Sequence, residues 1–217
     1  MLDTVIRFFQ SGGPFMYPIL AVLAIGLAIT VERWMYLTNA QVRNRSALRK
    51  LMPMLEKCDL NGVLQVAQKS NATVAKILHQ GLLNFNNARR RDDIEASMEE
   101  AIMEAIPRLE KRTHYLAMFA NIATLLGLLG TIIGLIKAFT AVAQVDPSMK
   151  AEILSTSISV AMNTTAFGLI VAIPLLLVYT YLQTKTTDII DSLEMTTVRF
   201  TNQLARCKAR QQGNQAQ

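Results

Sequence analysis

Three long stretches without a charged side chain constrain this 217-residue chain more than any other feature. They cover residues 15–31, 116–136 and 158–182, which are 17, 21 and 25 residues long. A helix needs roughly 20 apolar residues to cross the hydrocarbon core of a bilayer. The first stretch alone could be a soluble core helix, but two longer stretches in the same chain favour a third span. The sequence therefore predicts an all-α membrane protein with three transmembrane helices.

The distribution of basic residues predicts how these spans are oriented. Arg33, Arg43, Arg45, Arg49 and Lys50 follow the first span, whereas only Arg7 precedes it. Because cytoplasmic flanks of membrane spans carry an excess of Lys and Arg, we expect the N-terminus outside and the C-terminus in the cytoplasm.

The spans divide the chain into seven expected segments. They are an outward-facing amphipathic segment at 1–14, a first transmembrane helix at 15–31, a cytoplasmic helical domain at 32–114, a second transmembrane helix at 115–139, a periplasmic loop at 140–156, a third transmembrane helix at 157–182, and a cytoplasmic C-terminal helix and tail at 183–217. Apolar residues at helical spacing run from Ile94 into the second span and from the third span to Leu204. Both helices are therefore expected to extend into a cytoplasmic helical bundle, the second with a kink at Pro107, while Asp59 and Asp92 are expected to cap helices.

Charge and cysteine usage exclude several function classes. The net charge of +6 lies in residues 32–114 and 183–217 and is explained by topology. No nucleic-acid partner is expected, because the one basic cluster, Arg89-Arg90-Arg91, is followed at once by Asp92-Asp93 instead of forming part of a basic face. Cys58 and Cys207 share no metal-ligand spacing with a histidine, so we interpret them as free thiols and expect no metal site. Without paired carboxylates, a nucleophile set or a phosphate loop, neither an enzyme nor a bound cofactor is expected.

Small residues follow one side of the second and third spans. Helical residues three or four apart are neighbours, and small side chains let membrane helices approach closely. The sequence predicts that these two spans form an antiparallel hairpin whose helices meet or line a shared cavity. Packing alone is a sufficient role for any single glycine. The packing or pore-lining positions are Gly127, Gly130, Gly134, Ala161, Gly168 and Ala172.

Polar side chains mark one depth in the predicted hairpin. Thr131 and Thr165 each lie eight residues from the outer end of their span, roughly 12 Å below the outer surface. A membrane threonine can bond back to its own helix. Three consecutive polar residues, Asn163, Thr164 and Thr165, cost free energy in a span unless they face protein or water. We therefore predict that these four residues form a polar level on an ion pathway.

The predicted spans lack any group that could carry a proton. Residues 116–136 and 158–182 contain no Asp, Glu, His, Lys or Arg. If protons cross here, a titratable carboxylate has to come from another polypeptide. This predicts an obligate partner subunit.

Several motifs together resemble the MotA/TolQ/ExbB family of ion-conducting motor subunits, and more closely its TolQ/ExbB branch. The resemblance covers most of the chain and includes the three-span plan. Its motifs are Leu-Glu-Lys-Arg at 109–112, Leu-Gly-Leu-Leu-Gly-Thr-Ile-Ile-Gly at 126–134 and Thr-Thr-Ala-Phe-Gly-Leu-Ile-Val-Ala-Ile-Pro at 164–174.

This resemblance implies a function in the bacterial inner membrane. A ring of typically five copies would surround the membrane helices of two ExbD/TolR-like subunits, whose aspartate binds and releases the ion. Thr131 and Thr165 match the family threonines that face that aspartate, and Pro174 matches a helix kink. Ion flow would rotate the inner helices, and a TonB-like or TolA-like rod would carry the energy towards the outer membrane.

Two positions depart from the family pattern. Val160 stands where these proteins usually carry an acidic residue, and Thr180 stands where an asparagine is usual. The extra hydroxyl of Thr164 leaves both H⁺ and Na⁺ open as the coupling ion. The alternative function is a non-conducting structural scaffold that assembles a partner complex in the membrane.

Overall fold

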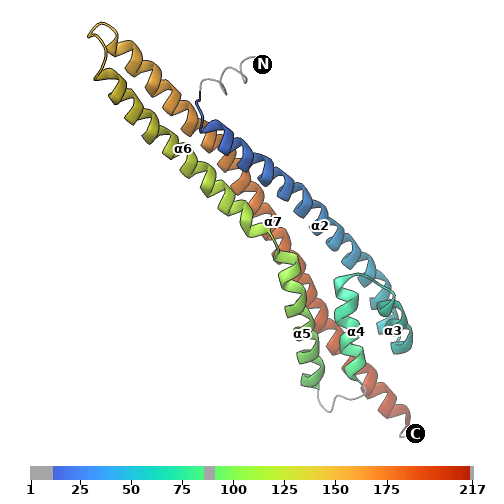
Figure 1. The fold of residues 1–217 in the computed structure, drawn as a ribbon. Helices are drawn as coiled ribbons and strands as arrows, with labels where there is room; N and C mark the ends of the chain where they lie inside the picture. Colours follow the sequence, from blue (N-terminus) through green and yellow to red (C-terminus); the bar gives the residue numbers. More distant parts are fainter. Residues whose placement is uncertain (1–11, 86–90, 216–217) are drawn as a thin grey trace. The chain divides into compact units, whose positions relative to one another are not determined.

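The structure, a computed structural model, describes residues 12–85 and 91–215, and within these ranges it is helical with no strand. The helices are α2 (Met16–Glu56), α3 (Leu60–Gln68), α4 (Thr73–Phe85), α5 (Arg91–Glu110), α6 (Thr113–Val142) and α7 (Lys150–Gln215) (Figure 1). Three helical stretches, within Met16–Glu56, Asp92–Val142 and Lys150–Ala209, are long and apolar enough to cross a membrane. The predicted fold class is confirmed. Most of the amphipathic segment expected at 1–14, and Arg89 and Arg90, lie outside the described residues.

The chain divides into two compact units. The first comprises residues up to Arg33 together with Arg112–Tyr181, and the second comprises Trp34–Lys111 together with the residues from Leu182 onwards. Helices α2 and α7 contribute residues to both units.

Several helices are longer than the sequence predicts. Helix α2 runs for 41 residues, past the expected end of the first span at Val31. Residues 32–52 contain no Gly or Pro, so nothing in this segment stops the helix. The connection between α6 and α7 shortens to 143–149 from the expected loop at 140–156, and α7 continues to Gln215, into the expected tail.

The expected continuous helix through Pro107 is instead divided into α5 and α6. Pro107 lies inside α5, and the break comes at Lys111 and Arg112, where Arg112 has a φ of 65°. The Lys111 amide still donates to the Pro107 carbonyl oxygen at 3.0 Å, so the helical bonding ends after the proline and not at it. A left-handed conformation at a non-glycine residue costs roughly 1–2 kcal/mol, and it ends the helix here.

Helix starts in the second unit are fixed by side chains. The Asp59 carboxylate accepts a hydrogen bond from the Gly62 amide at 3.0 Å, which confirms the predicted cap of α3. The Asn44 side-chain oxygen accepts one from the Val74 amide at 3.2 Å, at the start of α4. Asp92 lies within the first turn of α5, which includes residue Arg91, so it is not the residue that precedes the helix as predicted.

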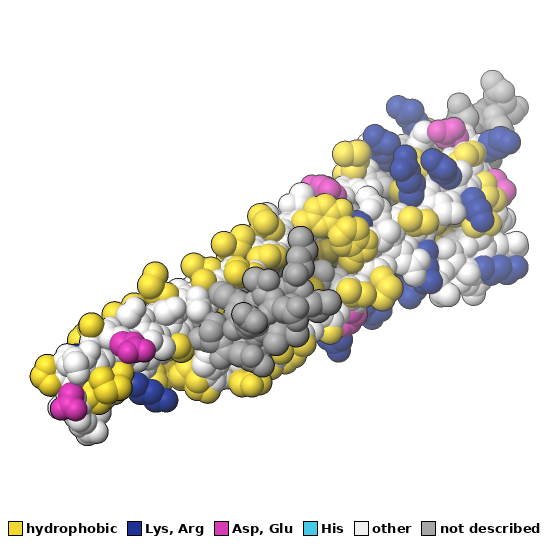
Figure 2. All heavy atoms as spheres, turned by 90° about the horizontal axis from the view of Figure 1, so that it is seen from above, with side chains coloured by type: hydrophobic (Ala, Val, Ile, Leu, Met, Phe, Trp, Pro, Cys, Tyr) yellow, Lys and Arg dark blue, Asp and Glu magenta, His cyan; other side chains and the backbone are white. Residues whose placement is uncertain are grey.

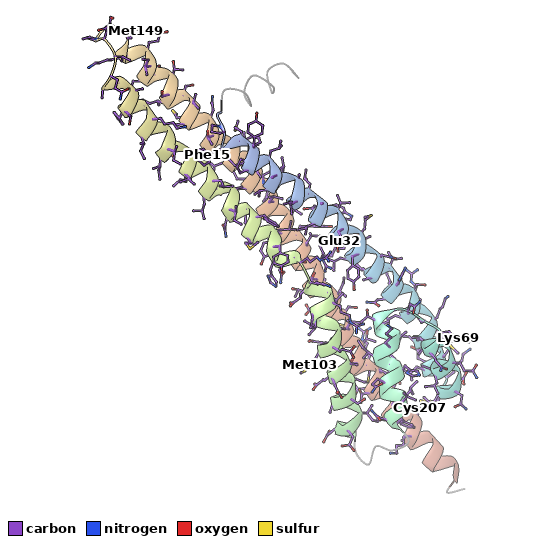
Figure 3. All side chains as sticks on the ribbon, in the orientation of Figure 1. Phe15, Glu32, Lys69, Met103, Met149 and Cys207 are labelled. Atoms are coloured by element: carbon purple, nitrogen blue, oxygen red, sulfur yellow. A yellow bond between two sulfur atoms is a disulfide. The ribbon has the colours of Figure 1, made fainter. Side chains whose placement is uncertain are left out.

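The two cysteines form a disulfide, so their interpretation as free thiols is wrong. Cys58, just after α2, pairs with Cys207 in the last part of α7, with the two Cα atoms 5.6 Å apart (Figure 3 labels Cys207). A separation of 149 residues left no local spacing from which to infer the pair. Only the packing within the second unit brings them together.

Candidate functional site: a polar level in a glycine-packed hairpin

Helices α6 and α7 of the first unit touch at the backbone level. A Cβ on Gly127 would lie 3.2 Å from the Cα of Thr165, and a Cβ on Gly168 would lie 2.7 Å from the carbonyl oxygen of Ala123. Neither position has room for a larger residue without movement of the facing backbone. The predicted meeting of these two helices is therefore confirmed.

The remaining small residues give the register of the hairpin. A Cβ on Gly130 would meet the Thr164 methyl at 2.5 Å, and one on Gly134 would meet the Ala161 Cβ at 2.8 Å. Residue numbers rise along α6 as their partners fall along α7, so the helices run antiparallel, as Figure 1 shows. Ala172 is also buried.

The Thr165 hydroxyl bonds across the hairpin and not within its own helix. It donates to the Gly127 carbonyl oxygen at 2.9 Å, and the side chain remains half-buried. An inter-helix bond from a hydroxyl in a membrane protein contributes about 0.6 kcal/mol on average and up to about 2 kcal/mol. Thr165 thus joins the two helices at a point where their backbones are in close contact.

Thr164 and Thr131 have different partners. The buried Thr164 hydroxyl lies 2.6 Å from the Gly12 carbonyl oxygen, just before α2, and 3.0 Å from that of Val160. The half-buried Thr131 hydroxyl donates to the Leu128 carbonyl oxygen of its own helix at 2.6 Å. By the register of the glycine contacts Thr131 lies at the level of the half-buried Asn163, about 3 Å in depth from Thr165. The four polar residues therefore share one level of the hairpin.

Helix α2 packs on this hairpin. Met16 and Ile19 are fully buried, and a Cβ on Gly26 would meet the Leu175 side chain at 2.8 Å. Leu175 follows Pro174, which lies inside the unbroken α7. A proline lacks the amide hydrogen that would bond to the Ile170 carbonyl oxygen, and this is the physical reason to expect a kink here. The kink at Pro174 stays a prediction.

An ion pair that the sequence did not reveal closes the other end of the first unit. The Arg112 guanidinium lies 2.8 Å from both carboxylate oxygens of Glu32, which Figure 3 labels. The residues are 80 positions apart, so neither spacing nor periodicity could have paired them.

The outer faces of the hairpin are apolar and open. Half or more of the residue is exposed at Leu125, Ile132, Ile170, Ile173 and Leu177. Figure 2 shows many hydrophobic side chains on the visible surface of the first unit, while Lys and Arg side chains gather on the second. An apolar surface of this extent has to be covered by lipid or by other protein.

These features define a class: a multi-pass, all-helical membrane protein with three candidate spans, two of which meet at glycines around a level of hydroxyl groups. The described residues contain no group of three His, Cys, Asp or Glu side chains that could hold a metal ion.

Comparison with known proteins agrees with this class. The MotA/TolQ/ExbB proton channel family matches residues 69–195, and the chain belongs to this family. It is 31% identical over 196 residues to a protein of Methanothermobacter thermautotrophicus named as an ExbB homolog, covering 88% of this chain and 67% of that protein. It is 25% identical over 202 residues to the biopolymer transport protein ExbB of Neisseria gonorrhoeae, covering 86% and 90%. It is 26% identical over 173 residues to the biopolymer transport protein exbB1 of Vibrio cholerae, covering 76% and 73%.

The family assignment confirms the resemblance seen in the sequence. It also places the chain among channel components and not among enzymes.

Proposed function

We propose that this chain is the ring-forming subunit of an ion-driven motor in a bacterial inner membrane, with its N-terminus in the periplasm and its C-terminus in the cytoplasm. Five copies would surround two helices of an ExbD/TolR-like partner. Ion flow would turn those helices relative to the ring, and a TonB-like or TolA-like protein would carry the energy to transport or integrity at the outer membrane.

The observation that carries this proposal is a polar level without an ionisable group. Thr131, Asn163, Thr164 and Thr165 supply hydroxyl and amide groups, but the apolar stretches of α6 and α7 contain no carboxylate. Such groups can hydrogen-bond an ion carrier and cannot themselves transport a proton. A carboxylate from the partner, alternately hydrated and enclosed at this level, would complete the pathway for H⁺ or Na⁺.

The exposed apolar residues of α6 and α7 support a ring. Within a single chain, apolar side chains of α6 and α7 remain exposed although α2 packs on the hairpin. Lipid, neighbouring copies and a central partner could each cover a part of this apolar surface. These family members are named for biopolymer transport, which supports an energised transport process for this chain as well.

A structural scaffold is the second candidate. The glycine contacts and the Thr165–Gly127 bond would be sufficient for a protein that only packs helices. The two functions differ in whether the polar level conducts an ion.

The deciding experiment reconstitutes the purified chain with its single-span partner in liposomes that contain a pH-sensitive dye or a sodium-sensitive dye, with and without sodium. The motor function predicts partner-dependent ion flux that Thr165→Ala and Thr131→Val abolish while the complex still assembles. Thr140→Val is the matched control. Thr140 also donates to its own helix, to Ile136 at 2.8 Å, but lies nine residues from Thr131 and so about 180° around α6.

Two results would refute the motor function. One is absence of flux with the assembled wild-type complex in either ionic condition. The other is wild-type flux in both threonine variants. Either would leave the scaffold as the better account.

A further inference from the structure

A cleft in the second unit is lined by basic residues and no acidic one. It has a volume of about 630 Å³ and lies between α2 and the segment that joins α3 to α4. Arg43, Lys50 and Lys69 line it together with the hydroxyls of Ser46 and Ser70. The volume falls within the usual range of small-molecule sites, about 300–1,000 Å³.

Two other clefts of the same unit are lined by both basic and acidic residues, unlike this one. A cleft of about 330 Å³ pairs Lys76 and Arg108 with Glu100 and Glu104. A cleft of about 240 Å³ contains Arg45 and Asp188. Both therefore carry their own counter-charges, whereas the larger cleft does not.

The three cations of the larger cleft come from two segments. Arg43 and Lys50 are seven residues apart, which places them on the same side of α2 two turns from each other. Lys69 is the C-terminal cap of α3. Within the described part of the chain, none of the three forms an ion pair. Their charges are thus available to a ligand.

The start of α4 adds to the positive field. Residues 70–72 border the cleft directly before α4 begins at Thr73, and the first turn of α4 contains no acidic residue. The N-terminus of a helix carries a partial positive charge and favours anions. No acidic side chain in the first turn neutralises this charge, and the Val74 amide already donates to Asn44, so the start of α4 contributes its dipole and not the Val74 amide.

We propose that this cleft binds a phosphate-bearing anion. The Arg43 guanidinium would hold two phosphate oxygens in a fork, Lys50 and Lys69 would supply point charges, and the serine hydroxyls would donate further bonds. The phosphate could belong to a soluble molecule or to the headgroup of an anionic phospholipid. This inference does not depend on ion conduction by the hairpin.

The test uses the full chain in phosphatidylcholine nanodiscs, with inorganic pyrophosphate as the probe and calorimetry at about 0.15 M salt, where the Debye length is about 8 Å. Pyrophosphate is expected to bind, and Arg43→Ala, Lys50→Ala and Lys69→Ala are each expected to raise Kd about tenfold, as loss of one charge-assisted bond predicts. Arg49→Ala is the matched control, since Arg49 is exposed on the same helix between Arg43 and Lys50 but does not line the cleft.

A second arm separates the two sources of phosphate. If a lipid headgroup occupies the cleft, adding phosphatidylglycerol to the nanodiscs weakens pyrophosphate binding to the wild type. If the ligand is soluble, the two lipid compositions give the same Kd. The proposal is overturned if pyrophosphate does not bind in phosphatidylcholine nanodiscs, or if Arg49→Ala raises Kd as much as Arg43→Ala does.

Discussion

The Thr165 hydroxyl donates a hydrogen bond to the Gly127 carbonyl oxygen, and the same glycine lets the Cα of Thr165 approach the opposite helix. The bond and the close contact depend on each other, because a side chain at position 127 would separate the two backbones. Thr165 can therefore serve both the packing of the hairpin and the proposed ion pathway, and the two roles need separate tests.

Thr165→Val should separate these roles, because valine keeps the shape of threonine and removes its hydroxyl. We expect a loss of about 0.6 kcal/mol and at most about 2 kcal/mol of hairpin stability, measured by unfolding in mixed micelles, together with loss of ion flux. Thr165→Ser keeps the hydroxyl and should retain the flux. Retained flux in Thr165→Val together with lost flux in Thr165→Ser would show that the methyl group matters and the hydroxyl does not.

The hairpin could be predicted from the sequence, but the partner of Thr165 could not. Small residues three and four apart necessarily form one side of a helix, so the stripes on the second and third spans predicted their contact. A threonine hydroxyl in a helix can reach the i−3 or i−4 carbonyl of its own helix or a carbonyl on a facing helix. Thr131 takes the first option and Thr165 the second, and only the register of the hairpin distinguishes them.

In the fold as well, features set by neighbouring residues could be predicted from the sequence, whereas contacts between residues far apart in the chain could not. The three apolar stretches predicted the spans, and Asp59 predicted the start of α3. The left-handed turn at Arg112 carries no glycine as a signal, and the partners of Arg112 and Cys58 lie 80 and 149 residues away. Such features arise from packing and have no local sequence pattern.

Gly168→Ala should disrupt the first unit much more than Gly26→Ala. The new Cβ at 168 meets the Ala123 carbonyl oxygen at 2.7 Å and the Gly127 Cα at 3.1 Å, which are backbone atoms of the facing helix. The new Cβ at 26 meets only side-chain atoms of Leu175, which can shift more readily than the backbone of a facing helix. We expect a loss of about 1–3 kcal/mol at 168, as for other overpacked positions, and less than about 1 kcal/mol at 26, measured by thermal unfolding in detergent. Similar losses at both positions would contradict the observed backbone contact.

Arg112→Gly should leave stability unchanged or raise it by up to about 2 kcal/mol, because it has two opposing effects of which the first is at least as large as the second. Glycine relieves a left-handed conformation that costs about 1–2 kcal/mol at arginine. It also removes the ion pair with Glu32, whose side chains are 46% and 49% exposed and which therefore contributes at most about 1 kcal/mol. Arg112→Ala lacks the first benefit and should be the less stable variant by about 1 kcal/mol in the same unfolding assay. If alanine proved as stable as glycine, the left-handed turn at this position would be refuted.

The Cys58–Cys207 disulfide should stabilise the second unit and can be tested in living cells. Closing so long a loop contributes roughly 2–5 kcal/mol, so dithiothreitol and Cys207→Ser should lower stability by similar amounts. A loss in the variant without a loss on reduction would assign the effect to packing alone.

Disulfides are rare in reducing compartments, and the proposed topology places this unit in the cytoplasm. Acid-quenched cells labelled with a maleimide polymer should show no modified chain before reduction and two labels after it, whereas two labels at the outset would mean that the bond is absent in the cell.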